Sequence, residues 1–97
     1  METDFSITIT DICEAFQVEE SFVITICEME LVEFRDTGSE KFIATDQIPL
    51  LERMVRLHRD LGINPAGLET IHYLLERMEG LQQELLRVRT RLRIYED

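Results

Sequence analysis

Few side chains in this 97-residue chain have the chemistry of a catalytic or metal-binding site. The two histidines, His58 and His72, fall in separate predicted helices between charged or aromatic neighbours, which is typical of surface or hydrogen-bonded core histidines. The two cysteines, Cys13 and Cys27, sit among apolar residues, with no second Cys or His at a metal-ligand spacing. The four glycines are scattered and form no phosphate-binding loop. The pattern predicts no enzyme, no cofactor and no metal, and reduced core cysteines, with a disulfide or redox switch as the alternative.

The charged residues of the chain are distributed unevenly along the sequence. Residues 1–48 hold twelve acidic and two basic side chains, and residues 49–97 hold eight of each, so the net charge of −10 lies in the first half. A DNA-binding surface needs Lys and Arg to neutralise phosphates, whereas this half would repel a duplex and attract a basic partner. The candidate partner-binding residues are therefore acidic, with a merely solvated face as the alternative: Asp11, Glu14, Glu19, Glu20, Glu28, Glu30 and Glu33.

One basic cluster departs from this trend near the end of the chain: Arg87, Arg89, Arg91 and Arg93. Residues two apart on a helix point about 200° apart, so these side chains cannot form a single stripe. We expect them to be solvated on a helix surface. Contact with nucleic acid, or with the acidic half of a neighbouring chain, is the alternative.

The elements of the first half are short. Residues 5–9 alternate apolar and polar side chains and predict a short lead-in or edge strand. Thr8 or Thr10 would cap a first helix with the apolar stripe Ile12, Cys13 and Phe16. A second helix is expected over residues 19–30, although its β-branched run at 23–26 leaves a strand open. Segments 32–34 and 41–43 around Gly38 predict a hairpin, which would be a wing after two helices.

Two longer helices follow. Asp46 is predicted to cap the third, whose apolar stripe of Leu50, Leu51, Met54, Val55, Leu57 and Leu61 runs to a stop at Gly62. Asn64-Pro65 begins the fourth helix, with Asn as N-cap and Pro at the first helical position. Its apolar residues are spaced three and four apart over more than three heptads, the pattern of a coiled coil: Ile71, Leu74, Met78, Leu81, Leu85, Val88, Leu92 and Tyr95.

A stripe of this length must be buried somewhere. We expect its first part, Ile71 to Met78, to fold back on the chain's own domain. The rest extends past any core that so small a domain offers, and predicts a helical partner, most simply a second copy in a homodimer. Flanking charges leave a parallel or an antiparallel pairing open, because exposed pairs contribute only tenths of a kcal/mol.

The order of these elements resembles the MerR family of regulators. Residues 29–32, Met-Glu-Leu-Val, resemble the end of that family's recognition helix, and residues 56–63, Arg-Leu-His-Arg-Asp-Leu-Gly-Ile, are similar to its "RLRELGF". The predicted fold is therefore mainly α: a MerR-like winged helix-turn-helix with a small β-hairpin wing over 1–63, then a long helix over 64–97, coiled coil from about residue 71. The arginines usual in the recognition helix are replaced by Ser21 and Ile24, and the wing offers only Arg35 and Lys41.

A closer resemblance is to the CbpM-like chaperone modulators. Residues 53–61, Arg-Met-Val-Arg-Leu-His-Arg-Asp-Leu, carry it together with Pro65, Gly67-Leu68 and the terminal heptads. It implies a small bacterial adaptor that binds the J-domain of a DnaJ-like co-chaperone of the CbpA type and inhibits its work with DnaK. J-domains present a basic helix, so an acidic binding surface suits this role. The alternative is a MerR-like dimeric DNA-binding transcriptional regulator, although the charge argues against DNA.

Nothing in the sequence predicts a membrane protein. No apolar run approaches the ~20 residues needed to cross a bilayer. The acidic start, Met1 to Asp4, is unlike a signal peptide. We therefore expect a cytoplasmic protein.

Overall fold

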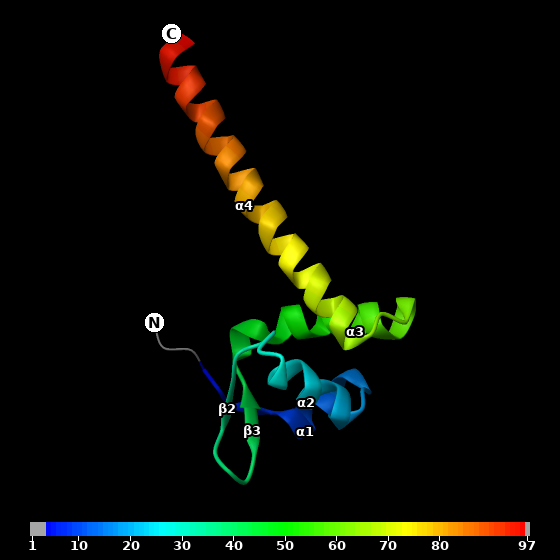
Figure 1. Ribbon diagram of the computed structural model, residues 1–97. Coiled ribbons are helices and arrows are strands. Elements are labelled where there is room, and N and C mark those ends of the chain that lie inside the picture. Colours follow the sequence, from blue (N-terminus) through cyan, green and yellow to red (C-terminus); the bar gives the residue numbers. More distant parts are fainter. Residues whose placement is uncertain (1–3, 97) are drawn as a thin grey trace.

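A head of short elements carries one long projecting helix in the computed structural model, which describes residues 4–96 (Figure 1). The mainly α fold with a hairpin between the second and third helices confirms the predicted fold class. We call the elements from β1 to α3 the head. In chain order the elements are β1 (Ile7–Thr8), α1 (Ile9–Phe16), α2 (Glu20–Glu28), β2 (Phe34–Asp36), β3 (Lys41–Ile43), the 3-10 helix η1 (Thr45–Gln47), α3 (Ile48–Leu61) and α4 (Pro65–Glu96).

Helix α1 begins at a capping box. The Thr8 hydroxyl accepts a hydrogen bond from the Asp11 amide at 3.1 Å, and the Asp11 carboxylate accepts one from the Thr8 amide at 3.4 Å. Of the two predicted caps, Thr8 is therefore the one used. The helix ends at Gln17, which has a φ of 52° and takes the left-handed conformation without being a glycine.

The end of α1 is tied to α3 by Arg59. Its guanidinium donates to the carbonyl oxygen of Phe16, and to that of Gln17 at 2.8 Å. These two oxygens lie at the negative end of the helix dipole, where a cation is favoured. The contact fixes the turn between the first two helices against the third.

Segment 20–28 is a helix, and the strand alternative for 23–26 is wrong. Helix α2 buries Phe22, Val23, Ile26 and Cys27, and burial outweighs the low helix propensity of its β-branched residues. The helix ends at Glu28, and Glu30, two residues later, has a φ of 59° that closes a Schellman-type cap. In this cap the amide of residue 30 donates to the Cys27 carbonyl at 2.9 Å, and that of residue 31 to the Ile26 carbonyl at 3.2 Å.

The hairpin is part of a three-stranded antiparallel sheet with the order β1-β3-β2. Ile43 of the central strand is fully buried between Ile7 on one side and Phe34 on the other. The predicted lead-in is therefore an edge strand, but only over two residues, because Ile9 already belongs to α1. At the hairpin turn, the Asp36 carboxylate accepts from the Gly38 amide at 2.8 Å.

The prediction that Asp46 caps the third helix is wrong. A one-turn 3-10 helix precedes α3, so the Gln47 amide donates to the Ala44 carbonyl at 2.9 Å and no side chain caps α3. The helix ends as predicted at Gly62, with a φ of 68°. Leu61, predicted in the apolar stripe, is 68% exposed because it is the last residue of the helix.

Helix α4 meets the head only at its base. Leu68 is its one buried residue within the described chain, and Ile71 and Leu75 are half-buried. Leu74 and Met78 are 51% and 54% exposed, so the prediction that the stripe folds back from Ile71 to Met78 is wrong for both. The face that packs on the head lies about 90° around the helix from the heptad stripe, which explains the difference.

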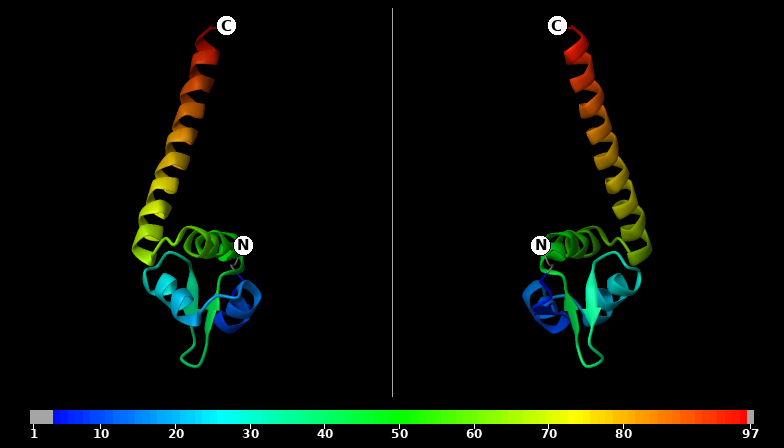
Figure 2. Two further views of the ribbon diagram at one scale, coloured as in Figure 1. Left: turned by 90° about the vertical axis from the view of Figure 1, so that its right-hand side faces the viewer. Right: turned by 90° about the vertical axis from the view of Figure 1, so that its left-hand side faces the viewer.

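The result is an elongated molecule of 60 × 34 × 20 Å. Beyond its first turns α4 runs away from the head, and the C-terminal end of the helix lies farthest from it (Figure 2). Within residues 4–96, no helix has the length and apolar character together that a membrane crossing needs.

Candidate functional site

The acidic side chains of the head are exposed and not neutralised by ion pairs. All seven predicted partner-binding residues lie at the surface. The two ion pairs found over residues 4–96 both join residues of α4, so neither involves a carboxylate of the head. The structure divides the seven residues among the two helix surfaces and two separate grooves.

Four of the seven lie on or next to the helices of the head, outside the two grooves, and one of these serves the fold. Asp11 is committed to the capping box of α1, whereas Glu14 on the same helix makes no such bond. Glu28 is exposed at the end of α2. Glu19 is the N-cap residue of α2, and its backbone carbonyl accepts from the Phe22 amide at 3.1 Å, while its side chain makes no capping bond.

Glu20 borders a groove of about 240 Å³ between α2 and the hairpin, which we call the hairpin groove. Asp36 and Glu40 add two carboxylates there, but the Asp36 carboxylate already accepts a hydrogen bond from the Gly38 amide. Lys41 adds a positive charge to the same groove. The groove is lined by Thr8, Ile9, Thr10, Glu20, Ile24, Asp36, Gly38, Ser39, Glu40 and Lys41.

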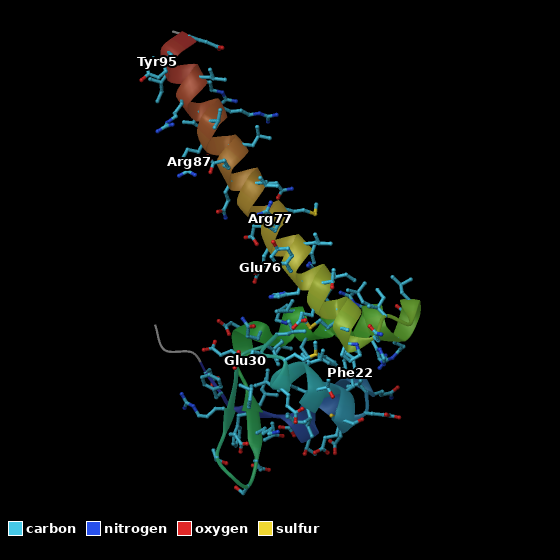
Figure 3. All side chains as sticks on the ribbon, viewed as in Figure 1. Phe22, Glu30, Glu76, Arg77, Arg87 and Tyr95 are labelled. Atoms are coloured by element: carbon cyan, nitrogen blue, oxygen red, sulfur yellow. The ribbon has the colours of Figure 1, made fainter. Side chains whose placement is uncertain are left out.

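Glu30 and Glu33 border a larger groove of about 520 Å³ at the base of α4, which we call the basal groove. Glu76 of α4 faces it too and pairs with His72 at 2.9 Å. Figure 3 labels Glu30 beside the start of α3 and Glu76 on α4 above it. The groove is lined by Glu30, Leu31, Val32, Glu33, Phe34, Gln47, Leu50, His72 and Glu76.

Sequence reasoning missed three carboxylates that the fold adds to these grooves: Asp36, Glu40 and Glu76. Asp36 and Glu40 belong to the acidic first half and flank the predicted hairpin turn, and that was the available signal for them. Glu76 lies in the half of the chain with no net charge. No local sequence signal identifies Glu76, because its place in the groove with Glu30 depends on how the base of α4 packs on the head.

Both cations of the acidic half are held against aromatic rings of the head. The guanidinium carbon of Arg35 lies 4.3 Å from the centroid of the Phe5 ring, and Lys41 Nζ lies 6.0 Å from that of Phe34. On α2, the positions compared above with recognition-helix arginines hold an exposed Ser21 and a half-buried Ile24. The winged helix-turn-helix therefore presents little positive charge.

The cysteines and histidines have structural surroundings. Burial raises the pKa of the Cys27 thiol from 9.0 to about 11, and burial followed by the charge of Glu20 raises that of Cys13. His58 stacks on the Phe22 ring with centroids 4.4 Å apart, and its Nδ1 lies 2.7 Å from the carbonyl oxygen of residue 63. Among the described residues, no group of three or more His, Cys, Asp or Glu could hold a metal ion.

The heptad stripe of α4 is the second candidate surface. Ile71 is half-buried at the base, and the other seven members are between 42% and 86% exposed: Leu74, Met78, Leu81, Leu85, Val88, Leu92 and Tyr95. The helix is unbroken through Gly80, so the three-and-four spacing places all eight on one side. The arginines Arg87, Arg89, Arg91 and Arg93 are all exposed, and Arg87 pairs with Glu84 at 2.5 Å.

Comparison with known proteins finds a matching family and a similar protein. Residues 7–90 match the model of the MerR HTH family regulatory proteins. Chaperone modulatory protein CbpM of Pseudomonas entomophila (strain L48) is 30% identical over 82 residues, which cover 84% of this chain and 81% of that protein. No solved structure matches the chain. The matched region runs from β1 into the second half of α4, so it includes both grooves and most of the stripe.

Proposed function

This chain is a CbpM-like member of the MerR HTH family of regulatory proteins, and we propose that it is a non-enzymatic chaperone modulator which binds the J-domain of a DnaJ-like co-chaperone. One observation carries the proposal: the exposed carboxylates of the head have no cationic partner within the described chain. A J-domain presents a basic helix to its Hsp70 partner. An acidic surface that covers this helix would inhibit the co-chaperone by occlusion, and opposite charges would speed the encounter.

Isothermal titration of the full chain with the J-domain of a co-chaperone from the same bacterium tests this proposal. We expect micromolar or tighter binding that weakens as salt rises, because the contacts are between exposed charges. The triple reversal Glu19→Lys, Glu20→Lys and Glu28→Lys removes negative charge from one helix and should weaken binding further. A folded chain that shows no binding at low salt would exclude the J-domain as partner.

The alternative function, promoter binding by a MerR-like regulator, is favoured by the helix-turn-helix fold alone. The two cations of the acidic half are engaged by Phe5 and Phe34, and α2 offers Ser21 and Ile24 where phosphate-binding arginines are expected. A gel shift at low salt separates the two functions, since a DNA-binding protein gains affinity steeply as salt falls. We expect no shift, and a salt-dependent shift would favour the regulator.

We also propose that a second copy of the chain covers the heptad stripe of α4. Seven apolar side chains with at least 42% exposure form a stripe longer than a monomeric soluble protein usually leaves open. An antiparallel pairing is supported by charge. Residues 65–80 carry three acidic and one basic side chain, and residues 81–96 carry two acidic and four basic ones. An antiparallel pairing therefore places the net negative half of one helix beside the net positive half of the other.

A pair of neighbouring leucines provides the test of this dimer. Leu85 lies in the stripe and is 51% exposed, whereas Leu86 lies outside it and is 66% exposed. Leu85→Asp should convert the dimer to a monomer in analytical ultracentrifugation, and Leu86→Asp should leave its mass unchanged. If both variants remain dimeric, the stripe is not the interface.

Oxidative cross-linking tests the direction of the pairing. Met78 and Val88 are equally distant from the middle of the stripe, so an antiparallel dimer places each opposite the other. A mixture of Met78→Cys and Val88→Cys chains should form a heterodimeric disulfide, and Met78→Cys alone should not. Efficient cross-linking of Met78→Cys alone would indicate a parallel dimer.

A further inference from the structure

We infer that the partner binds at the basal groove rather than across the acidic head as a whole, and that the groove accepts one side of a basic amphipathic helix. This inference rests on the proposed function and adds the location of the contact. Three features support it: the carboxylates that converge on the groove, the apolar residues at its floor, and the access to the groove that remains when α4 pairs with a second copy.

Three carboxylates from two distant parts of the chain converge on the groove. Glu30 and Glu33 follow α2, and Glu76 comes from α4 more than forty residues later. The left-handed backbone at Glu30 ends α2 and turns the chain so that both of the earlier carboxylates reach the rim. His72 is the single positively ionisable side chain of the lining, and it already pairs with Glu76. The rim therefore favours Lys and Arg.

Four apolar residues lie at the floor of the groove, although most of its open surface is polar. Leu31 and Val32 are buried beneath it, and Phe34 and Leu50 are half-buried and partly open to it. Phe34 and Leu50 offer a small apolar contact inside an acidic rim. This combination matches a helix whose one side carries an apolar residue flanked by Lys or Arg, because the apolar contact removes surface from water while the rim pairs the charges. At about 520 Å³ the groove can receive several side chains of such a helix.

The hairpin groove is a poorer match to the same partner. Its volume is about 240 Å³, and Lys41 lies on its rim. Asp36 is also held by the Gly38 amide at 2.8 Å, which leaves its carboxylate less free to pair with an incoming cation. Glu76 is likewise held by His72 in the basal groove, so the difference between the two grooves is the positive charge of Lys41, which would repel a basic helix.

The basal groove also stays open in a dimer. Glu76 is two residues from both Leu74 and Met78 of the stripe, which places it about 160° around the helix from each. A second copy seated on the stripe thus lies on the far side of α4 from the groove. Each dimer would present two grooves and bind two partner helices.

Two double variants with the same change in net charge test the location. Glu30→Lys with Glu33→Lys reverses the basal rim, and Glu20→Lys with Glu40→Lys reverses the hairpin groove. An exposed ion pair changes affinity by about 1.5- to 5-fold, so the loss of two pairs together with two like-charge contacts of similar size should raise the Kd for the J-domain by more than about 5-fold. The hairpin-groove control changes only the long-range field and should raise it less than about 5-fold.

Equal losses in the two variants, or a larger loss in the hairpin-groove variant, would overturn the location while leaving J-domain binding intact. If the unmodified chain does not bind the J-domain, the proposed function itself fails. Amide NMR shifts provide a readout that does not depend on any substitution. On addition of the J-domain, the signals of Leu31, Phe34 and His72 should move more than those of Gly38 and Ser39, and the reverse pattern would contradict the inference.

Discussion

The packing of α4 on the head can be measured by removing its one buried side chain. Leu68→Ala deletes three carbon atoms from a leucine that is 1% exposed. At about 0.8 kcal/mol for each buried carbon, the transfer loss is about 2.4 kcal/mol. The cavity left between the helices raises the expected cost to about 3–4 kcal/mol, since α3 and α4 can collapse only partly onto the space. For a domain of this size that corresponds to a melting temperature about 12–32 °C lower.

The same substitution at Leu74 is the matched control. Leu74 is on the same helix, 51% exposed, and belongs to the stripe rather than to the face that packs on the head. Leu74→Ala should therefore lower the stability of the isolated chain by less than about 1 kcal/mol. Its cost should appear in self-association, so it should depend on protein concentration.

Urea and thermal unfolding followed by circular dichroism, over a wide range of protein concentration, distinguish the two positions. The loss for Leu68→Ala should persist at the lowest concentration, whereas that for Leu74→Ala should fade as the chain dissociates. If Leu74→Ala costs as much as Leu68→Ala at low concentration, the stripe packs on the head and our account of α4 is refuted.

Four further predictions concern side chains of the head. Gln17→Gly should raise the free energy of unfolding by about 1 kcal/mol, because a glycine adopts the left-handed turn without a Cβ clash; a loss measured in urea unfolding would show that the side chain itself matters. Arg59→Met should cost about 1–2 kcal/mol through the lost bonds to the Phe16 and Gln17 carbonyls, whereas Arg56→Met should cost little, and equal losses in thermal melts would contradict this. Because burial raises the pKa of Cys27 to about 11, the unfolded chain releases the thiol proton first, so stability should fall as the pH rises from 9 towards 11; a Cys27→Val variant with the same decline would refute this cause. In the native protein a thiol reagent should modify Cys13 before Cys27, and the opposite order would be inconsistent with their burial.

Much of the fold follows from local sequence signals. The capping residue Thr8 and the Asn64-Pro65 pair place two helix starts, and Gly62 places a helix end. These succeed because a cap is satisfied by bonds within three or four residues, whichever way the chain later packs. The heptad spacing of α4 is likewise a local property, and the helix is continuous over the whole predicted stripe.

Where the sequence left a choice open or a prediction was wrong, a competing contact decided the outcome. The β-branched run of α2 is compatible with a strand until it is buried in the core, where Val23 and Ile26 lose all exposure. Asp46 is a good cap by type, but the 3-10 turn before α3 satisfies the backbone instead. The stripe of α4 predicts burial without saying against what, and the head takes a different face of the helix.

The candidate site divides in the same way. The sequence by itself determined that the first half is acidic, that its Glu and Asp side chains would be exposed, and that a long apolar stripe would follow. Only the tertiary structure decided that Glu30, Glu33 and Glu76 share one groove, and that this groove lies on the far side of α4 from the stripe. Charge and periodicity are properties of the chain's order, whereas a groove exists only where separate segments meet, and that is fixed by the packing of Leu68 into the head.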